Sequence, residues 1–253
     1  MLSLTDSVGK GAVNVREDAL LVQSLLNRFR PSDAALIRID GAVGPQTLSA
    51  IVDFQRRVMR MISPDGVISP GGPTFKALCG GDTDGLKIAW GAKVDPEFKQ
   101  KAISICSSLQ IPVDFLMSAM AFESGESFSP SIRNAAGSGA VGLIQFMPTT
   151  ARALGTSVEN LIAMSAVQQL DFVQKYFSPH RGKLCSLEDV YMAILFPAAI
   201  GKSPGATLFA SPSIQYQQNS GLDVNHDGIV TVQEAASRVR AKFIKGLQPG
   251  CIG

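Results

Sequence analysis

An almost wholly apolar run that ends in one glutamate is the feature that most constrains the fold of this chain. The segment IPVDFLMSAMAFES starts with Pro112, a residue suited to the first turn of a helix, and places Leu116, Met120 and Glu123 on one face at helical spacing. A helix that is apolar all round is expected inside a protein core. Glu123 should therefore emerge among apolar neighbours.

Burial would give Glu123 a chemical role. Apolar surroundings disfavour the ionised carboxylate and so raise its pKa toward neutrality. A carboxyl group that keeps its proton near neutral pH can donate that proton to the departing oxygen of a glycosidic bond. The alternative is an ordinary exposed glutamate at a helix end, which the helix alone would favour because surface glutamates are common.

A glycine-rich segment, GSGAVGLIQFMPTT, follows the glutamate. Its glycines, among them Gly142, allow the backbone to lie close to a ligand. Next come an amide, Gln145, an apolar pair, Phe146 and Met147, and Pro148, which should start another helix. Backbone groups and an amide can bind N-acetyl and hydroxyl groups, and flat apolar surface can lie against a sugar ring. The segment favours a sugar-binding site.

These residues resemble a known enzyme family. The ES pair followed by GAVGLIQFMPTTA is similar to the glutamate–serine and GxxGLMQxMPxT motifs of soluble lytic transglycosylases, lysozyme-like enzymes that cleave peptidoglycan. The resemblance covers residues 95 to about 205 and implies a goose-lysozyme-like helical domain. It also implies that Glu123 is the catalytic acid/base and that the substrate groove includes Ser124, Gly142, Gln145 and Met147.

Two departures from the family pattern concern the surroundings of Glu123. The family's mid-loop serine has no clear counterpart between Asn134 and Ser138. A later motif, usually AYNAG, reads AILFPAAIG, so that Phe196 and Pro197 stand where Tyr and Asn are expected. Tyr191, about one and a half turns earlier on a helix, is the candidate to replace the missing hydroxyl.

The number of acids near the site decides the reaction. Hydrolysis of a glycosidic bond usually needs two carboxylates, whereas Glu126, the nearest candidate, looks like a solvated loop residue. A lone acid favours transglycosylation, in which the muramyl 6-hydroxyl closes on C1 to give a 1,6-anhydro sugar without water or cofactor. Two alternatives stay open: a hydrolase that uses Asp171 or Asp189 to activate water, and a wall-binding protein with a degenerate catalytic domain.

Residues 8 to 80 contain a half-repeat. The stretches RIDGAVGPQTLSAIVDFQRRV and SPDGVISPGGPTFKALCG share a DG turn, a proline and a threonine, and Thr47 and Thr74 are predicted to cap amphipathic helices. With the earlier helix in VREDALLVQSLLNRF, this predicts a small three-helix domain. The alternative function is a spacer or dimerisation module.

The half-repeat resembles the peptidoglycan-binding domain of cell-wall hydrolases. This resemblance implies the domain order of the modular endolysins of giant bacteriophages: a binding domain at residues 8–80, a linker at 81–94 and a catalytic domain at 95–253, all mostly α.

A second motif lies near the C-terminus. DVNHDGIVTVQE matches a twelve-residue calcium loop, with Asp223, Asn225 and Asp227 at positions 1, 3 and 5, the Ile229 carbonyl at position 7 and Glu234 at position 12. The segment before it, SPSIQYQQNSG, is a poor helix, so the motif would be half of a usual paired unit. The alternative is a metal-free turn whose aspartates cap the following helix. A calcium ion here would be structural.

Composition excludes several other classes. A net charge of +2 with scattered lysines and arginines lacks the basic stripe of a nucleic-acid-binding protein. Cys79, Cys106, Cys185 and Cys251 are far apart, which favours free or buried thiols over a disulfide framework. No secretion signal or membrane-spanning run is evident. We therefore expect a monomer made in a host cytoplasm that acts on periplasmic peptidoglycan after release.

Overall fold

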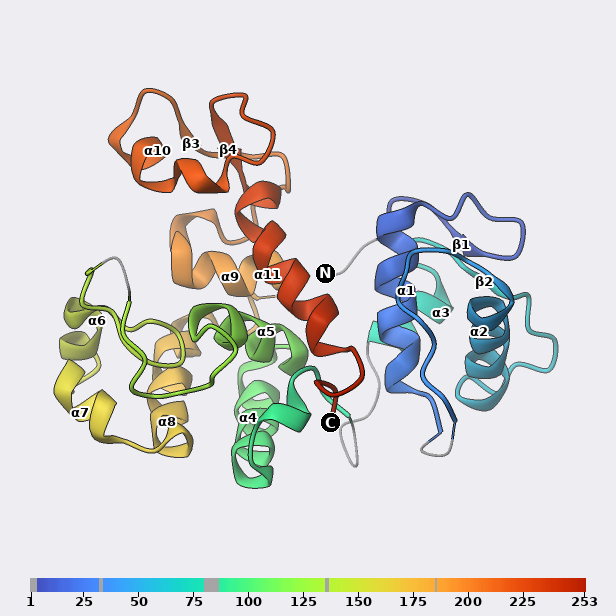
Figure 1. Cartoon of the computed structure of the whole chain (residues 1–253), viewed down its shortest axis with the longest axis horizontal. Coiled ribbons are helices and arrows are strands. Elements are labelled where there is room, and N and C mark those ends of the chain that lie inside the picture. Colours follow the sequence, from blue (N-terminus) through green and yellow to red (C-terminus); the bar gives the residue numbers. More distant parts are fainter. Residues whose placement is uncertain (1–3, 32–33, 80–86, 135–136, 185) are drawn as a thin grey trace. The chain divides into compact units, whose positions relative to one another are not determined.

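A computed structural model describes residues 4–31, 34–79, 87–134, 137–184 and 186–253. The chain divides into two compact units (Figure 1): residues 1–93 with 244–253, and residues 94–243. The catalytic domain was expected to include the last ten residues, which cluster instead with the first unit.

The predicted linker lies partly outside the described residues. Its described end, however, is not an exposed connector, because Ile88, Ala89 and Trp90 are buried. The Ile88 N–H donates to the Gly253 carbonyl over 2.7 Å, and the Trp90 N–H to the Gly246 carbonyl over 3.0 Å. This stretch is therefore part of the packed first unit.

The first unit is built on short helices and one small antiparallel ladder. Its elements are β1 (Val8–Gly9), α1 (Arg16–Arg28), α2 (Pro45–Arg57), β2 (Val67–Ile68), α3 (Pro73–Cys79) and the 3₁₀ turn η1 (Gly91–Lys93), with β1 paired to β2. Leu25, Ile51, Phe54 and Leu78 from the three helices are buried together as its core. The three predicted helices are present.

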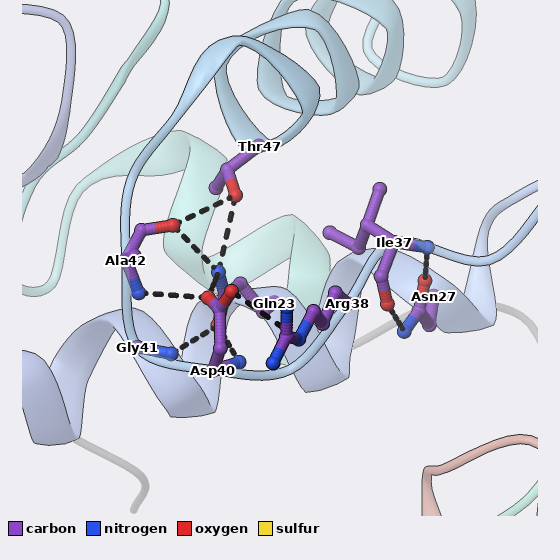
Figure 2. Close-up of polar contacts among 8 residues, drawn as sticks. All are labelled: Gln23, Asn27, Ile37, Arg38, Asp40, Gly41, Ala42 and Thr47. Carbon is purple, nitrogen blue, oxygen red and sulfur yellow. Dashed lines mark hydrogen bonds and ion pairs between the residues drawn. The ribbon is translucent and has the colours of Figure 1, made fainter.

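Two buried glutamines hold the two copies of the half-repeat in the same way. Figure 2 shows the first: the Gln23 amide donates to Asp40 Oδ1, the Ala42 carbonyl and Thr47 Oγ1 over 3.0–3.1 Å, and its oxygen accepts from the Asp40 and Gly41 N–H groups. Gln55 makes the matching set with Asp65, Val67, Thr74 and the Gly66 N–H. Each glutamine fastens its DG turn to the start of the next helix.

The predicted capping role of the threonines is wrong. α2 begins at Pro45 and α3 at Pro73, so Thr47 and Thr74 lie inside the first turn. Their hydroxyls accept from the glutamine amides instead. A buried asparagine adds a similar contact, because the Asn27 side chain exchanges two hydrogen bonds with the Ile37 backbone (Figure 2).

The second unit is mostly helical, which confirms the predicted fold class. Its elements are α4 (Pro96–Leu109), α5 (Val113–Glu123), α6 (Pro148–Ala153), α7 (Val158–Ala163), α8 (Ala166–Phe177), η2 (Ser178–His180), α9 (Leu187–Leu195), η3 (Pro197–Ala199), β3 (Thr207–Ala210), α10 (Ile214–Asn219), η4 (Ser220–Leu222), β4 (Ile229–Thr231) and α11 (Val232–Gly246), of which residues 244–246 are counted with the first unit.

Helix α5 is the core of this unit. It packs against α4 and α9, while α4 also packs against α8 (Figure 1). Leu116, Met117, Ala119 and Met120 expose no surface. The helix is surrounded by other elements, which explains why its sequence is apolar on every side. Among the described helices none is long and apolar enough to cross a membrane alone; α4 and α5 pass such a test only as a pair bent by 119°.

The predicted free thiols are confirmed where the structure describes them. Cys79, Cys106 and Cys251 form no disulfide, and Cys106 and Cys251 are buried. Cys185 lies outside the described residues.

The glutamine contacts predict a specific loss of stability. Gln23→Met keeps the side-chain volume but leaves the turn N–H groups and the Thr47 hydroxyl without their partner, which should cost at least about 2 kcal/mol. Trp90, the only tryptophan, is buried in the same unit and reports its unfolding in denaturant by fluorescence. Gln46→Met, at an exposed position of α2, is the control. Superimposable unfolding curves for Gln23→Met and wild type would contradict the role given to Gln23.

Candidate active site

Glu123 is the last residue of α5, where the buried helix gives way to a loop. The turn is sharp, because Gly125 and Glu126 both have positive φ, at 60° and 70°. The side chain is half-buried, and burial raises the pKa of Glu123 to about 7. The carboxyl group can therefore hold its proton at neutral pH, as a general acid must.

Two tyrosines lie within electrostatic reach of Glu123. Burial, and then the charge of Glu123, raise the pKa of Tyr176 on α8 and of Tyr191 on α9, so both phenols keep their protons. The Tyr176 hydroxyl donates to the Ala193 carbonyl over 2.7 Å. The Tyr191 ring meets Phe122 edge to face, with the ring centroids 5.5 Å apart. Sequence reasoning considered Tyr191 but missed Tyr176, which no motif marks.

Phe196 does not restore the missing hydroxyl. It follows the last residue of α9, and its ring packs on Phe209 of β3 at a centroid distance of 5.6 Å. Pro197 then starts η3. Tyr176 and Tyr191 are the hydroxyl groups whose pKa the charge of Glu123 affects.

The glycine-rich segment folds back on itself. Val141 pairs with both Arg133 and Phe146, and the Val141 and Phe146 backbones exchange two hydrogen bonds of 3.1 and 2.8 Å. Gly142 lies at φ +79°, and a Cβ there would stand 2.2 Å from Gln169 Oε1. Glycine is needed at this position for packing against a protein side chain, not for approach to a ligand.

Gln169 of α8 holds this loop and was not predicted. It exposes no surface. Its oxygen accepts from the Leu143 N–H over 2.7 Å, and its amide donates to the Pro130 and Leu161 carbonyls, each over 3.0 Å. One side chain therefore joins the middle of the glycine-rich segment and the chain before it, at Pro130, to α7 and α8.

The other predicted substrate residues fall into two groups. Ser124 is fully buried, and its hydroxyl accepts from the Phe128 N–H over 3.0 Å. Like Gly142, it shapes the loop and is not open to substrate, contrary to the prediction. Gln145 is half-buried at φ 53° with its amide on the Gly142 carbonyl, and Met147 is 43% exposed. These two retain accessible surface for a ligand.

The other carboxylates considered from the sequence are engaged in ion pairs or with backbone N–H groups. Glu126 is half-buried and ion-paired with Lys242 of α11, so the prediction of a solvated loop residue is wrong. Asp171 pairs with Lys101 at 2.8 Å. Asp189 forms the capping box of α9 with Ser186 and also accepts from the Gly201 N–H.

The predicted calcium ligands lie apart from these residues in sequence: Asp223, Asn225 and Asp227 follow η4, Ile229 begins β4 and Glu234 is in the first turn of α11. In the described part of the chain, no three His, Cys, Asp or Glu side chains gather as a metal site by themselves. A metal could only be held with amide or backbone oxygens in addition.

Comparison with known proteins agrees with this geometry. Residues 102–174 match the family described as the Transglycosylase SLT domain. The matched stretch runs from α4 to α8 and includes Glu123, the glycine-rich loop and Gln169. No curated protein matches the chain. The chain thus carries a lysozyme-like SLT domain, and it is an enzyme of the lytic transglycosylase type that acts on peptidoglycan.

Proposed function

We propose that this enzyme cleaves the β-1,4 bond between N-acetylmuramic acid and N-acetylglucosamine by transglycosylation, with Glu123 as the acid and base. The observation that carries the proposal is the burial of Glu123, which raises its pKa to about 7. At that pKa a carboxyl group can both give up and regain a proton near neutral pH.

The reaction needs one carboxyl group used twice. Protonated Glu123 donates to the bridging oxygen as the glycosidic bond breaks. The carboxylate then takes the proton of the muramyl 6-hydroxyl, whose oxygen bonds to C1. The products are a 1,6-anhydromuramyl end and a free N-acetylglucosamine end, and Glu123 is protonated again without water being consumed. The protonated Tyr176 and Tyr191 supply dipoles beside the transient carboxylate.

The hydrolase alternative is less well supported. It requires a second carboxylate free to activate water. Asp171, Asp189 and Glu126 each bind a cation or backbone N–H groups in the described structure. Because these carboxylates already have partners, transglycosylation to a 1,6-anhydro product is favoured over hydrolysis.

Replacing the acid tests the assignment. Glu123→Gln should lower turnover at least about 10²–10⁴-fold, because an amide cannot transfer the proton. Release of muropeptides from purified peptidoglycan is the measurement. The matched control is Asp171→Asn, which also removes one carboxylate from the domain but should retain near wild-type activity. Loss of activity in Asp171→Asn, with Glu123→Gln still active, would favour the hydrolase and exclude our assignment.

Mass spectrometry of the same muropeptides identifies the reaction. Products lighter by one water than those of a hydrolase are expected. Fully hydrated products would show that Glu123 works with an activated water.

The raised pKa of Glu123 predicts an alkaline limit of activity. Turnover depends on the protonated acid, so kcat/KM should fall about tenfold per pH unit above a pKa of about 7. Folding is linked to the same proton: the free energy of unfolding is highest below the ordinary glutamate pKa of 4.5 and falls as the pH rises to about 7. Glu123→Gln should therefore melt higher than wild type above pH 7 but not below 4.5. Identical differences at both pH values would mean that Glu123 is not buried in this way.

We also propose that residues 8–80 bind peptidoglycan, which would make the chain an endolysin of the modular bacteriophage type. Support comes from the half-repeat and its paired glutamine contacts.

Removing the module tests this second proposal. A chain without residues 1–80 should sediment less with insoluble peptidoglycan yet still cleave soluble glycan fragments, because Glu123 lies in the other unit. The full-length Glu123→Gln chain is the reference, since it binds without digesting its target. Equal sedimentation of the two would identify the module as a spacer.

A further inference from the structure

Side chains in the loop between η4 and α11 accept hydrogen bonds from the backbone N–H groups of the same loop. The Gly228 N–H donates to Asp223 Oδ2 over 3.0 Å, the Asp227 N–H to Asn225 Oδ1 over 3.0 Å, and the Ile229 N–H to Asp227 Oδ1 over 2.8 Å. Gly228 lies at φ +82°, which turns the chain sharply. Residues 223 to 229 are thus held in a compact turn, and Glu234 follows in the first turn of α11.

Two carboxylate oxygens in this loop are buried without a hydrogen-bond partner: Asp223 Oδ1 and Glu234 Oε1. Asp223 is only 3% exposed. Its other oxygen accepts from the Tyr216 hydroxyl over 2.7 Å, and the other oxygen of Glu234 accepts from the Thr231 N–H and hydroxyl. A buried oxygen of an ionised group that has no partner is costly.

Asp223 and Glu234 stand at the first and last positions of the same twelve-residue motif, and each keeps one buried carboxylate oxygen without a hydrogen-bond partner. Such a pair of oxygens suits a bound cation.

We propose that this loop binds a calcium ion through Asp223, Asn225, Asp227, Glu234 and the Ile229 carbonyl. All these donors are oxygen, as a hard cation requires, and their order matches the twelve-residue calcium loop. In the described residues the carboxylates of Asp223, Asp227 and Glu234 do not gather as a metal site by themselves, so the ion would also need the Asn225 amide oxygen and the Ile229 carbonyl.

The alternative of a simple helix cap fits less well. α11 is capped by Thr231, whose hydroxyl accepts from the Glu234 N–H over 3.2 Å, and by Glu234 Oε2 in return. The aspartates bind loop N–H groups and take no part in this cap. The cap explains one oxygen of Glu234 and leaves Oε1 and Asp223 Oδ1 unexplained.

The loop has a helix before it, although the sequence there predicts a poor one, and it also has a strand partner. SPSIQYQQNSG does form a helix, α10, capped by Ser213, and it supplies Tyr216 to Asp223. On the other side, β4 lies beside β3 (Figure 1), and Val230 is paired with Phe209. A helix and a strand partner therefore hold the loop on both sides.

The ion would stabilise the helix that reaches the active-site loop. α11 begins at the calcium loop and carries Lys242, which pairs with Glu126, three residues after Glu123. Arg240 pairs with Glu188 of α9, and Arg238 donates to the Gly221 carbonyl. This consequence rests on the proposed role of Glu123, but calcium binding itself does not.

Direct binding tests the proposal. The full chain, freed of metal by a chelator, should bind CaCl₂ in calorimetry at one site and prefer it to MgCl₂. At about a hundredfold excess over Kd, calcium should raise Tm by roughly 5 to 10 °C. Melting curves that coincide with calcium and with chelator would overturn the proposal.

Two variants separate metal binding from capping. Glu234→Gln keeps an acceptor for the Thr231 cap but removes the charge, and combined with Asp223→Asn it should abolish the calcium shift while the metal-free Tm stays at or above the wild-type value. Asp171→Asn should keep the full shift. A shift retained by the double variant would place calcium elsewhere and overturn the assignment.

The same titration in Glu123→Gln distinguishes this inference from the proposed function, because binding should be unchanged in a chain that cannot react. Chelator should leave wild-type turnover intact at room temperature and shorten its lifetime only on heating. Full loss of turnover in chelator, in a folded chain at room temperature, would contradict a structural ion.

Discussion

The burial of α5 is the constraint on which the catalytic unit depends. A helix with no polar face has to be enclosed, and α4 and α9 enclose it. The helix ends at Glu123, so enclosing it also withdraws one carboxyl group from water. Its raised pKa is therefore a consequence of packing that the core would impose in any case. The fold stabilises the acid in the protonated state through the same contacts that stabilise the domain.

Buried side-chain amides hold in place the loops that lack regular structure. Gln169 binds the glycine-rich segment at Leu143 and the chain before it at Pro130, and Gln23 and Gln55 bind the two DG turns. An amide suits this purpose because it donates and accepts at once and carries no charge to desolvate. Gly142 shows the packing that results, since any side chain there would collide with Gln169.

Sequence patterns revealed the elements but not these contacts. The helical spacing of Leu116, Met120 and Glu123 predicted α5 and the raised pKa of Glu123, because both predictions follow from residues that are neighbours in the sequence. Gln169 could not be found in this way, because its partners lie up to 39 residues away and a glutamine is ordinarily exposed. The Glu126–Lys242 pair spans 116 residues, and without it Glu126 reads as solvated. Thr47 was misjudged because its true partner, Gln23, is on the preceding helix.

Helix α11 connects these observations. Along one helix, its side chains contact Gly221 beside the proposed calcium loop, Glu188 at the start of α9 and Glu126 in the turn after Glu123. Exposed ion pairs contribute little singly, but the Arg240–Glu188 and Lys242–Glu126 pairs are partly buried and share one helix with the Arg238 contact, so ordering the helix orders all three. Stabilising the N-terminal end of α11 therefore also stabilises the turn that follows Glu123. A structural ion in the calcium loop would act in this way, although the loop takes no part in the chemistry.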